Sequence, residues 1–232
     1  IPSSVTSIGD SAFYGCSNLT SIDIPSSVTS IGIYVFNGCS KLTSINVSED
    51  NENYSSLDGI LYNKNMTELI KYPGGKKDLT TYVIPDSVTS IGIGAFSECS
   101  SLTSIDLPDT LTSIGTQAFI GCSSLTSIEL PSSVTSIGNA VFSGCSSLTN
   151  IDLSNTQITS IGISAFNRCS SLTSIELPSS VTSIGNAVFS GCSSLTNIDL
   201  SNTQITSIGI SAFNRCSSLT SIELPSSVTS IG

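Results

Sequence analysis

The chain has 232 residues, of which 38% are hydrophobic and only 10% are charged. That apolar share is large enough to build a buried core, which excludes a disordered chain. Seven basic residues stand against 17 acidic ones, and the net charge of −10 argues against nucleic acid and anionic membranes as partners, while no apolar run is long enough to insert into a bilayer.

Along the chain, a short segment of the form L-x-x-I-x-L returns at a nearly constant spacing. Its nine copies span 19–24, 42–47, 79–84, 102–107, 125–130, 148–153, 172–177, 195–200 and 219–224. Successive copies are 23 or 24 residues apart, except for one step of 37 residues between the second and the third. A unit this short cannot bury its apolar side alone, so successive coils must stack and share one core.

Within one regular unit, three predicted elements follow each other. Residues 124–130 (SLTSIEL) form a short strand, and Pro131 blocks further ladder pairing at the corner. Residues 134–138 (VTSIG) are a second extended segment, and 139–147 (NAVFSGCSS) a turn or a single helical turn that leads back. The pattern therefore predicts an α/β repeat solenoid of parallel short strands, with a mostly extended or short-helical convex side.

The repeated signature LPSSVTSIGxxxFxGCSSLTSIxL, present nearly verbatim at 130–153, resembles the BspA-like, or Treponema pallidum-type, leucine-rich repeats. The resemblance covers the chain apart from the longer unit, so residues 1–232 are expected to form a single leucine-rich-repeat domain, a fragment of a longer array. It implies an arc of parallel strands in a surface or secreted protein associated with adhesion. It supplies no catalytic residues and implies no cofactor.

Each regular unit carries one cysteine at the same place, which gives eight cysteines in all. Stacking would set them about 4.8 Å apart, with side chains that point the same way into the core. Such side chains do not meet with the geometry of a disulfide, so we expect buried free thiols. Zinc needs converging ligands and usually a CxxC pair or a histidine, and the chain has no histidine, so no metal is expected there.

The position between Ile and the final Leu of each strand points outward, away from the core. In seven of the nine strands it holds an acid, and we call these residues the acidic row: Asp23, Asp106, Glu129, Asp152, Glu176, Asp199 and Glu223. Carboxylates one strand apart repel each other, which raises their pKa values or recruits cations. The row could dock a basic or hydrogen-bonding partner, bind Ca²⁺ weakly, or only keep the surface soluble.

A glycosidase built on two acids of the row is disfavoured. Such an enzyme needs two carboxyl groups in different environments, whereas these acids sit in copied surroundings.

The 37-residue step forms an irregular unit over residues 46–84, where ILYN and TELIKY flank Lys64-Asn65 and predict a β-hairpin. The unit concentrates tyrosine and lysine, a combination typical of binding hot spots. Its candidate contact residues are Tyr54, Tyr62, Lys64, Lys71, Tyr72, Lys76 and Lys77. The alternative is a structural variant that only bends the arc.

The sequence as a whole predicts a non-enzymatic interaction scaffold, a segment of a surface or secreted adhesin-like protein that binds proteins or glycans of a host or a neighbouring cell. The alternative is a structural spacer that extends other domains from a cell surface. Because the chain begins and ends within a repeat, end-to-end self-association is also expected.

Overall fold

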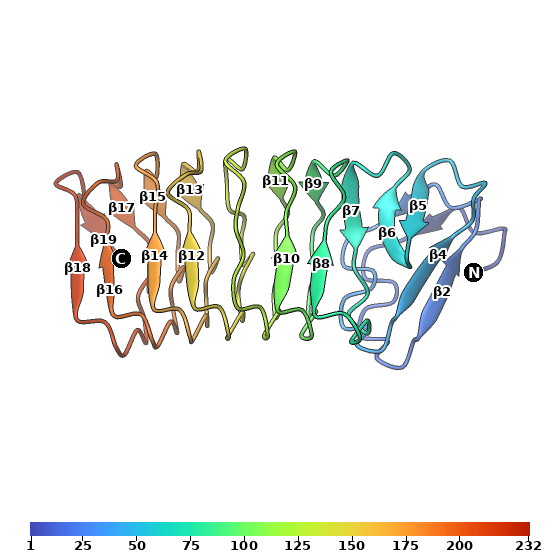
Figure 1. Cartoon of the computed structure of the whole chain (residues 1–232), viewed down its shortest axis with the longest axis horizontal. Coiled ribbons are helices and arrows are strands. Elements are labelled where there is room, and N and C mark those ends of the chain that lie inside the picture. The colour runs from blue at the N-terminus through green and yellow to red at the C-terminus, as the bar shows by residue number, and fades with distance from the viewer.

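The structure, a computed structural model, describes all residues from 1 to 232 and consists of strands and turns without a helix. The chain winds into an elongated parallel β-solenoid, with the two termini at its opposite ends (Figure 1). No segment forms a helix that is long and apolar enough to cross a membrane.

One side of the solenoid, which we call the strand face, carries the L-x-x-I-x-L segments. Its strands are β2 (Ser21–Ile24), β4 (Ser44–Val47), β8 (Thr81–Val83), β10 (Ser104–Asp106), β12 (Asn150–Asp152), β14 (Ser174–Glu176), β16 (Asn197–Asp199) and β18 (Ser221–Glu223). Ile151 pairs with Ile175 and Ile198 with Ile222, in parallel. These partners are 24 residues apart, so the repeat length sets the register.

A second side carries the VTSIG segments as two-residue strands. They are β1 (Ser7–Ile8), β3 (Ser30–Ile31), β9 (Ser90–Ile91), β11 (Ser113–Ile114), β13 (Ser160–Ile161), β15 (Ser183–Ile184), β17 (Ser207–Ile208) and β19 (Ser230–Ile231). From β13 to β19 these strands form one continuous parallel sheet. We call this side the second face.

The predicted α/β class is wrong, because the third side, which we call the turn face, consists of turns and contains no short helix. Ala140 and Gly144 have φ angles of 52° and 76°, which an α-helix does not accommodate. Three alternate amides instead join one coil to the next: Ala140, Phe142 and Gly144 donate to the carbonyl oxygens of Ile163, Ala165 and Asn167, each at 2.8 Å. Donors that would bond within a helix are therefore used between coils.

The core is built from side chains stacked on their copies. The rings of Phe119 and Phe142 lie 5.4 Å apart between centroids and 3° from parallel. The Cys145 thiol donates to the Phe119 carbonyl oxygen of the preceding coil at 3.2 Å, and burial raises the pKa of this thiol to about 12. All eight cysteines are free and six are buried, which confirms the expectation of free thiols that pack in the core.

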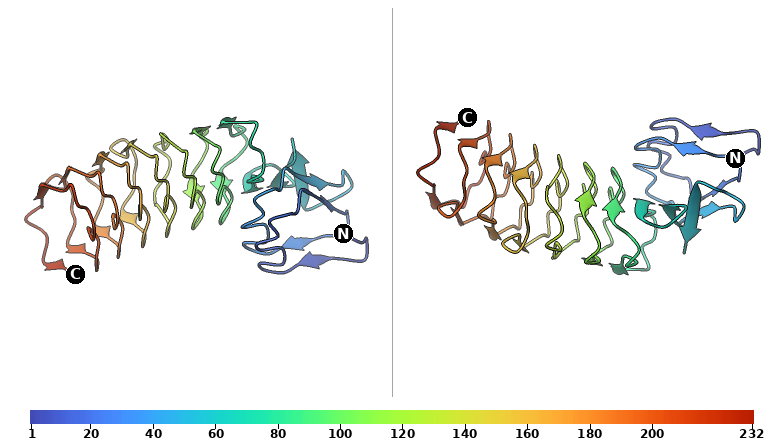
Figure 2. Two further views of the ribbon diagram at one scale, coloured as in Figure 1. Left: turned by 90° about the horizontal axis from the view of Figure 1, so that it is seen from below. Right: turned by 90° about the horizontal axis from the view of Figure 1, so that it is seen from above.

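The irregular unit interrupts the stack. It forms the antiparallel strands β5 (Tyr54–Leu57), β6 (Ile60–Asn63) and β7 (Glu68–Lys71), and β7 then pairs in parallel with β9. The buried apolar residues divide here into a cluster of ten, mostly before residue 46, and a cluster of 46 that extends from Ile60 to Ala212. Figure 2 shows the first two coils set off from the line of the later coils.

Candidate functional site

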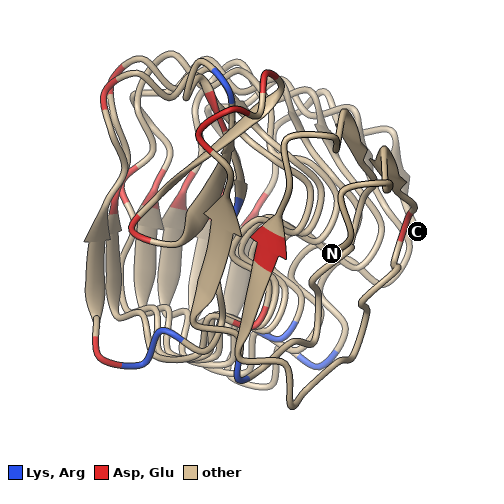
Figure 3. Ribbon diagram, turned by 90° about the vertical axis from the view of Figure 1, so that its right-hand side faces the viewer, with Lys and Arg blue, Asp and Glu red and all other residues tan.

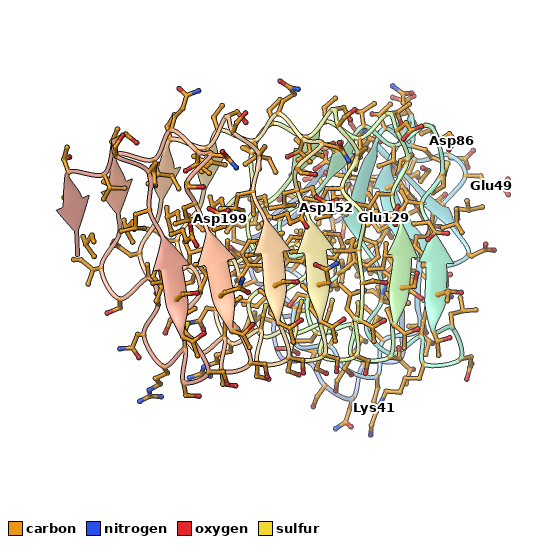
Figure 4. All side chains as sticks on the ribbon, turned by 60° about the vertical axis from the view of Figure 1, so that its left-hand side comes forward. Lys41, Glu49, Asp86, Glu129, Asp152 and Asp199 are labelled. Carbon is orange, nitrogen blue, oxygen red and sulfur yellow. The ribbon has the colours of Figure 1, made fainter.

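The acidic row lies on the strand face, and all seven of its members are exposed. Register places Asp152 beside Glu176 and Asp199 beside Glu223. Glu129, Asp152 and Asp199 lie along this face in Figure 4, and in Figure 3 most Lys and Arg segments gather at the lower edge of the solenoid instead. The row therefore presents carboxylates on an open surface.

Hydrogen bonds hold two carboxylates of the row in their charged form. The Ser154 amide donates to Asp152 Oδ1 at 2.8 Å, and the Ser201 amide donates to Asp199 Oδ1 at 2.8 Å. Bonds from the side chain and amide of these serines lower the pKa of both aspartates. The expected rise in pKa from mutual repulsion is therefore wrong at these two positions, because both residues cap the corner that follows their strand.

The row changes character near the irregular unit. Asn46 takes the place of an acid there and donates from Nδ2 to Asp23 Oδ1 at 2.8 Å. Val83, which pairs with Asp106, is 67% exposed and interrupts the carboxylates with an apolar side chain. No group of three or more His, Cys, Asp or Glu side chains in the chain is arranged to hold a metal ion.

Three of the seven candidate residues of the irregular unit are buried, namely Tyr62, Lys71 and Tyr72. The Tyr72 ring stacks on Phe96 with 5.3 Å between centroids, and Tyr62 shares a hydroxyl hydrogen bond with Tyr82. These tyrosines serve the core, where regular coils use phenylalanine. Buried side chains cannot reach a partner, so the expected aromatic hot spot does not form on the surface.

The other four candidates of the irregular unit are accessible. Lys64 and Lys77 are exposed, whereas Tyr54 and Lys76 are half-buried. Lys64 and Lys76 donate to backbone carbonyl oxygens of Asn51 and Asp58. The Tyr54 hydroxyl accepts a bond from the Ile31 amide at 2.8 Å, so this residue bridges the irregular unit to β3.

A groove that the sequence reasoning missed opens at the irregular unit, between β3 and β7. Its volume is about 370 Å³, and Ile31, Ile33, Ile70 and Ile93 are among the residues that line it. The sequence does carry a signal for it. No cysteine occurs between Cys39 and Cys99, so the irregular unit lacks the segment that closes the turn face in every regular coil.

Comparisons with known proteins agree with this geometry. The family described as the BspA type leucine rich repeat region matches residues 1–74, 74–160 and 153–232, in six copies. No curated protein matches the sequence.

Solved structures of bacterial proteins resemble the whole chain. A leucine-rich repeat protein from Eubacterium ventriosum is 31% identical, with a TM-score of 0.90 over 100% of this chain and 62% of its own. A leucine rich cell surface protein from Faecalibacterium prausnitzii is 36% identical, with a TM-score of 0.72 over 96% of this chain and 52% of its own. The pneumococcal vaccine antigen PcpA is 26% identical, with a TM-score of 0.71 over 98% and 54%. The chain thus spans less than two thirds of each of these proteins.

Proposed function

Because the chain belongs to the BspA-type leucine-rich repeat family, we propose that it is an interaction scaffold of a bacterial cell surface and that its acidic row docks a basic surface of a partner protein. The observation that carries the proposal is the row itself, seven exposed carboxylates on one open face of stacked strands. The lowered pKa values of Asp152 and Asp199 keep these two side chains charged in mildly acidic surroundings as well.

Two kinds of observation support a surface role. A similar structure is that of a protein described as a cell surface protein, and another is that of a vaccine antigen. The solenoid also offers a long, regular face, which lets many weak contacts add up along one partner. Individual exposed ion pairs contribute only about 0.2–1 kcal/mol each, so the proposed affinity depends on several carboxylates acting together.

The test is a binding measurement on immobilised matrix proteins and polysaccharides with a charge-neutralised row. The row variant carries Glu129→Gln, Glu176→Gln and Glu223→Gln, which leaves the corner caps at Asp152 and Asp199 intact. The matched control carries Glu52→Gln, Asp86→Asn and Asp109→Asn, which removes three exposed charges elsewhere on the surface.

The proposal expects a protein ligand whose affinity falls roughly fivefold to tenfold in the row variant, because about three weak pairs are lost, and changes little in the control. Salt should weaken the binding of the parent chain more than that of the row variant. Equal losses in both variants would reject docking by the row. Binding to polysaccharides alone would point to a glycan partner, and no saturable binding at all would favour the spacer.

A further inference from the structure

The turn-face ladder is complete between regular coils and is broken once, after the second coil (residues 25–45). In the first coil, Ser11, Phe13 and Gly15 donate to the carbonyl oxygens of Ile33, Val35 and Asn37. The equivalent amides of the second coil are those of Tyr34, Phe36 and Gly38, and none of them donates to a backbone carbonyl. The irregular unit supplies no carbonyl row for them.

On the second face, the edge of the same coil has no strand partner, and the Ile31 amide donates to the Tyr54 hydroxyl there. Strand β3 pairs only with β1, on the side away from the irregular unit. In the fourth coil (residues 85–107), the carbonyl oxygens of Thr89 and Ile91 accept bonds from Thr112 and Gly115 of the next coil. The equivalent carbonyls of the second coil, at Thr29 and Ile31, accept none.

These free groups line one wall of the groove between β3 and β7, which we call the junction groove. Thr29, Ile31, Tyr34 and Phe36 all contribute to this wall. In chain order, this wall offers two acceptors, the carbonyl oxygens of Thr29 and Ile31, and then two donors, the amides of Tyr34 and Phe36. An extended backbone supplies the complementary order, as the fifth coil (residues 108–130) does for the fourth. The cavity of about 370 Å³ is within the usual range for ligand pockets.

The opposite wall adds apolar and charged contacts. Ile93 of the fourth coil is 38% exposed on this wall, and it faces the groove together with Ile33 of the second coil, which is 44% exposed. Among the lining residues, the charged ones are Glu68 and Lys71. Lys71 is buried and donates to the Gly94 carbonyl oxygen at 2.9 Å, whereas Glu68 is only half-buried. The charge open to an incoming ligand is therefore negative.

We propose that the junction groove binds an extended segment of a partner polypeptide, which lies parallel to the second coil and carries a Lys or Arg side chain opposite Glu68. Backbone bonds to Thr29, Ile31 and Tyr34 fix the segment, and apolar side chains contact Ile33 and Ile93. This site is separate from the acidic row and does not depend on the proposed role of that row.

The probe is a capped, fluorescein-labelled peptide that copies residues 182–190 (TSIGNAVFS), a segment that makes the corresponding inter-coil bonds to the preceding coil, with Lys in place of the Asn. Fluorescence anisotropy with the full chain should show saturable binding with a Kd below about 1 mM. The same peptide with N-methyl groups on the amides that face Thr29 and Ile31 should bind at least about tenfold more weakly, because those hydrogen bonds are lost.

Protein variants locate the site. Ile33→Arg should weaken binding about tenfold or more, because it removes an apolar contact and repels the Lys of the peptide. The matched control is Ile163→Arg, at the equivalent position of a fully paired coil, where the side chain is 50% exposed and little change is expected. Glu68→Gln should weaken the Lys peptide by about threefold to fivefold and leave the Asn peptide unchanged.

Two outcomes would overturn the proposal. One is the absence of saturable binding by a chain that circular dichroism shows to be folded. The other is binding that survives Ile33→Arg and is lost with Ile210→Arg, which would place the peptide on the open edge of the last coil. The row variant Glu129→Gln, Glu176→Gln, Glu223→Gln should bind the peptide like the parent chain. A negative result for docking by the acidic row would therefore leave the proposal for the junction groove unaffected.

Discussion

Lys71 donates a hydrogen bond from Nζ to the Gly94 carbonyl oxygen at 2.9 Å, and the same nitrogen lies 3.4 Å from Asn37 Oδ1. The side chain thereby links the second coil to the fourth where backbone bonds between these coils are missing. Burial lowers the pKa of Lys71, so the folded state holds this proton less tightly than the unfolded state. Its contribution to stability therefore improves as pH rises toward the ordinary lysine value.

Replacing Lys71 separates its packing from its charge. Lys71→Met keeps the aliphatic stem and removes a costly buried charge, so we expect a stability within about 1 kcal/mol of the parent chain. Lys71→Ala removes the stem as well and should cost about 2–4 kcal/mol through the cavity that it leaves. Urea denaturation of both variants measures the difference. If Met proves as damaging as Ala, the ammonium group itself holds the junction.

Glycines on the second face allow coils to approach closely. A Cβ atom at Gly162 would lie 2.6 Å from the Gly138 carbonyl carbon, and backbone cannot yield as a flexible side chain can. Gly162→Ala should therefore push two coils apart and cost at least about 2 kcal/mol, as overpacking does elsewhere. Thermal unfolding followed by circular dichroism tests this, and an unchanged midpoint would contradict the packing described.

A glycine on the turn face serves another purpose. Gly144 has a φ of 76°, and a Cβ atom there would only touch Gly121 at 3.5 Å, so Gly144→Ala should cost about 1–2 kcal/mol through backbone strain alone. Arg168 occupies an equivalent turn position with a φ of 59°. Arg168→Gly should therefore stabilise the chain by up to about 1 kcal/mol. The higher conformational entropy of glycine in the unfolded chain reduces this gain. Opposite signs in the two unfolding midpoints are the expected result.

The stacked thiols predict a loss of stability at alkaline pH. Burial raises the pKa of Cys99, Cys145 and Cys192 from the ordinary value of 9.0 to about 12. Between these pH values the unfolded chain loses protons that the folded chain keeps, so each thiol lowers stability by about 1.4 kcal/mol per pH unit. The contribution of the thiols should be flat near neutral pH, and above about pH 9 their combined effect should outweigh the opposing effect of Lys71, so that stability falls steeply.

Urea midpoints between pH 7 and pH 11 measure this dependence. Cys145→Ala removes one thiol. The fall of the free energy of unfolding with alkaline pH should therefore become shallower by the contribution of that one thiol. A slope unchanged from pH 7 to pH 11 in the parent chain would contradict the burial of the thiols.

The repeat spacing alone predicted much of the fold. The spacing of the L-x-x-I-x-L segments fixes which residues pair, as Ser7 with Ser30 and Ile151 with Ile175 show. It also predicted the outward position of the acidic row. It could not decide between a helical turn and a chain of turns at 139–147, because the same residues suit both until the next coil offers acceptors for Ala140 and Phe142.

The irregular unit was harder to predict, because its strand β6 does not alternate between buried and exposed residues. Ile60, Leu61 and Tyr62 are all buried, since β6 is covered on both sides by the two parts of the core. Tyr72 is buried in the larger cluster, and Lys71 beside it is buried with its ammonium group at Asn37 and Gly94. Residue type favoured a tyrosine and lysine contact surface, but the surroundings decide whether such side chains reach solvent.

The hydrogen bonds of two aspartates of the acidic row depend on the corner that follows each strand. Asp152 and Asp199 are followed by LSNTQ corners, where a serine amide two residues later lies within reach of the carboxylate. Glu129, Glu176 and Glu223 precede LPSSV corners instead. The sequence shows that the two kinds of corner alternate. The hydrogen bond from the serine amide to the aspartate is seen only once the geometry of the corner is known.

The interruption of the turn-face ladder after the second coil is the central structural claim, and hydrogen exchange tests it most directly. Exchange rates of single amides should be compared between Tyr34 and Gly38, which have no carbonyl partner, and Ala140 and Gly144, which donate to the next coil at 2.8 Å. We expect the first pair to exchange at least about a hundredfold faster at equal pH and temperature, because only the second pair must open to exchange. Equal protection of both pairs would show that the ladder continues through the irregular unit and would contradict the interruption.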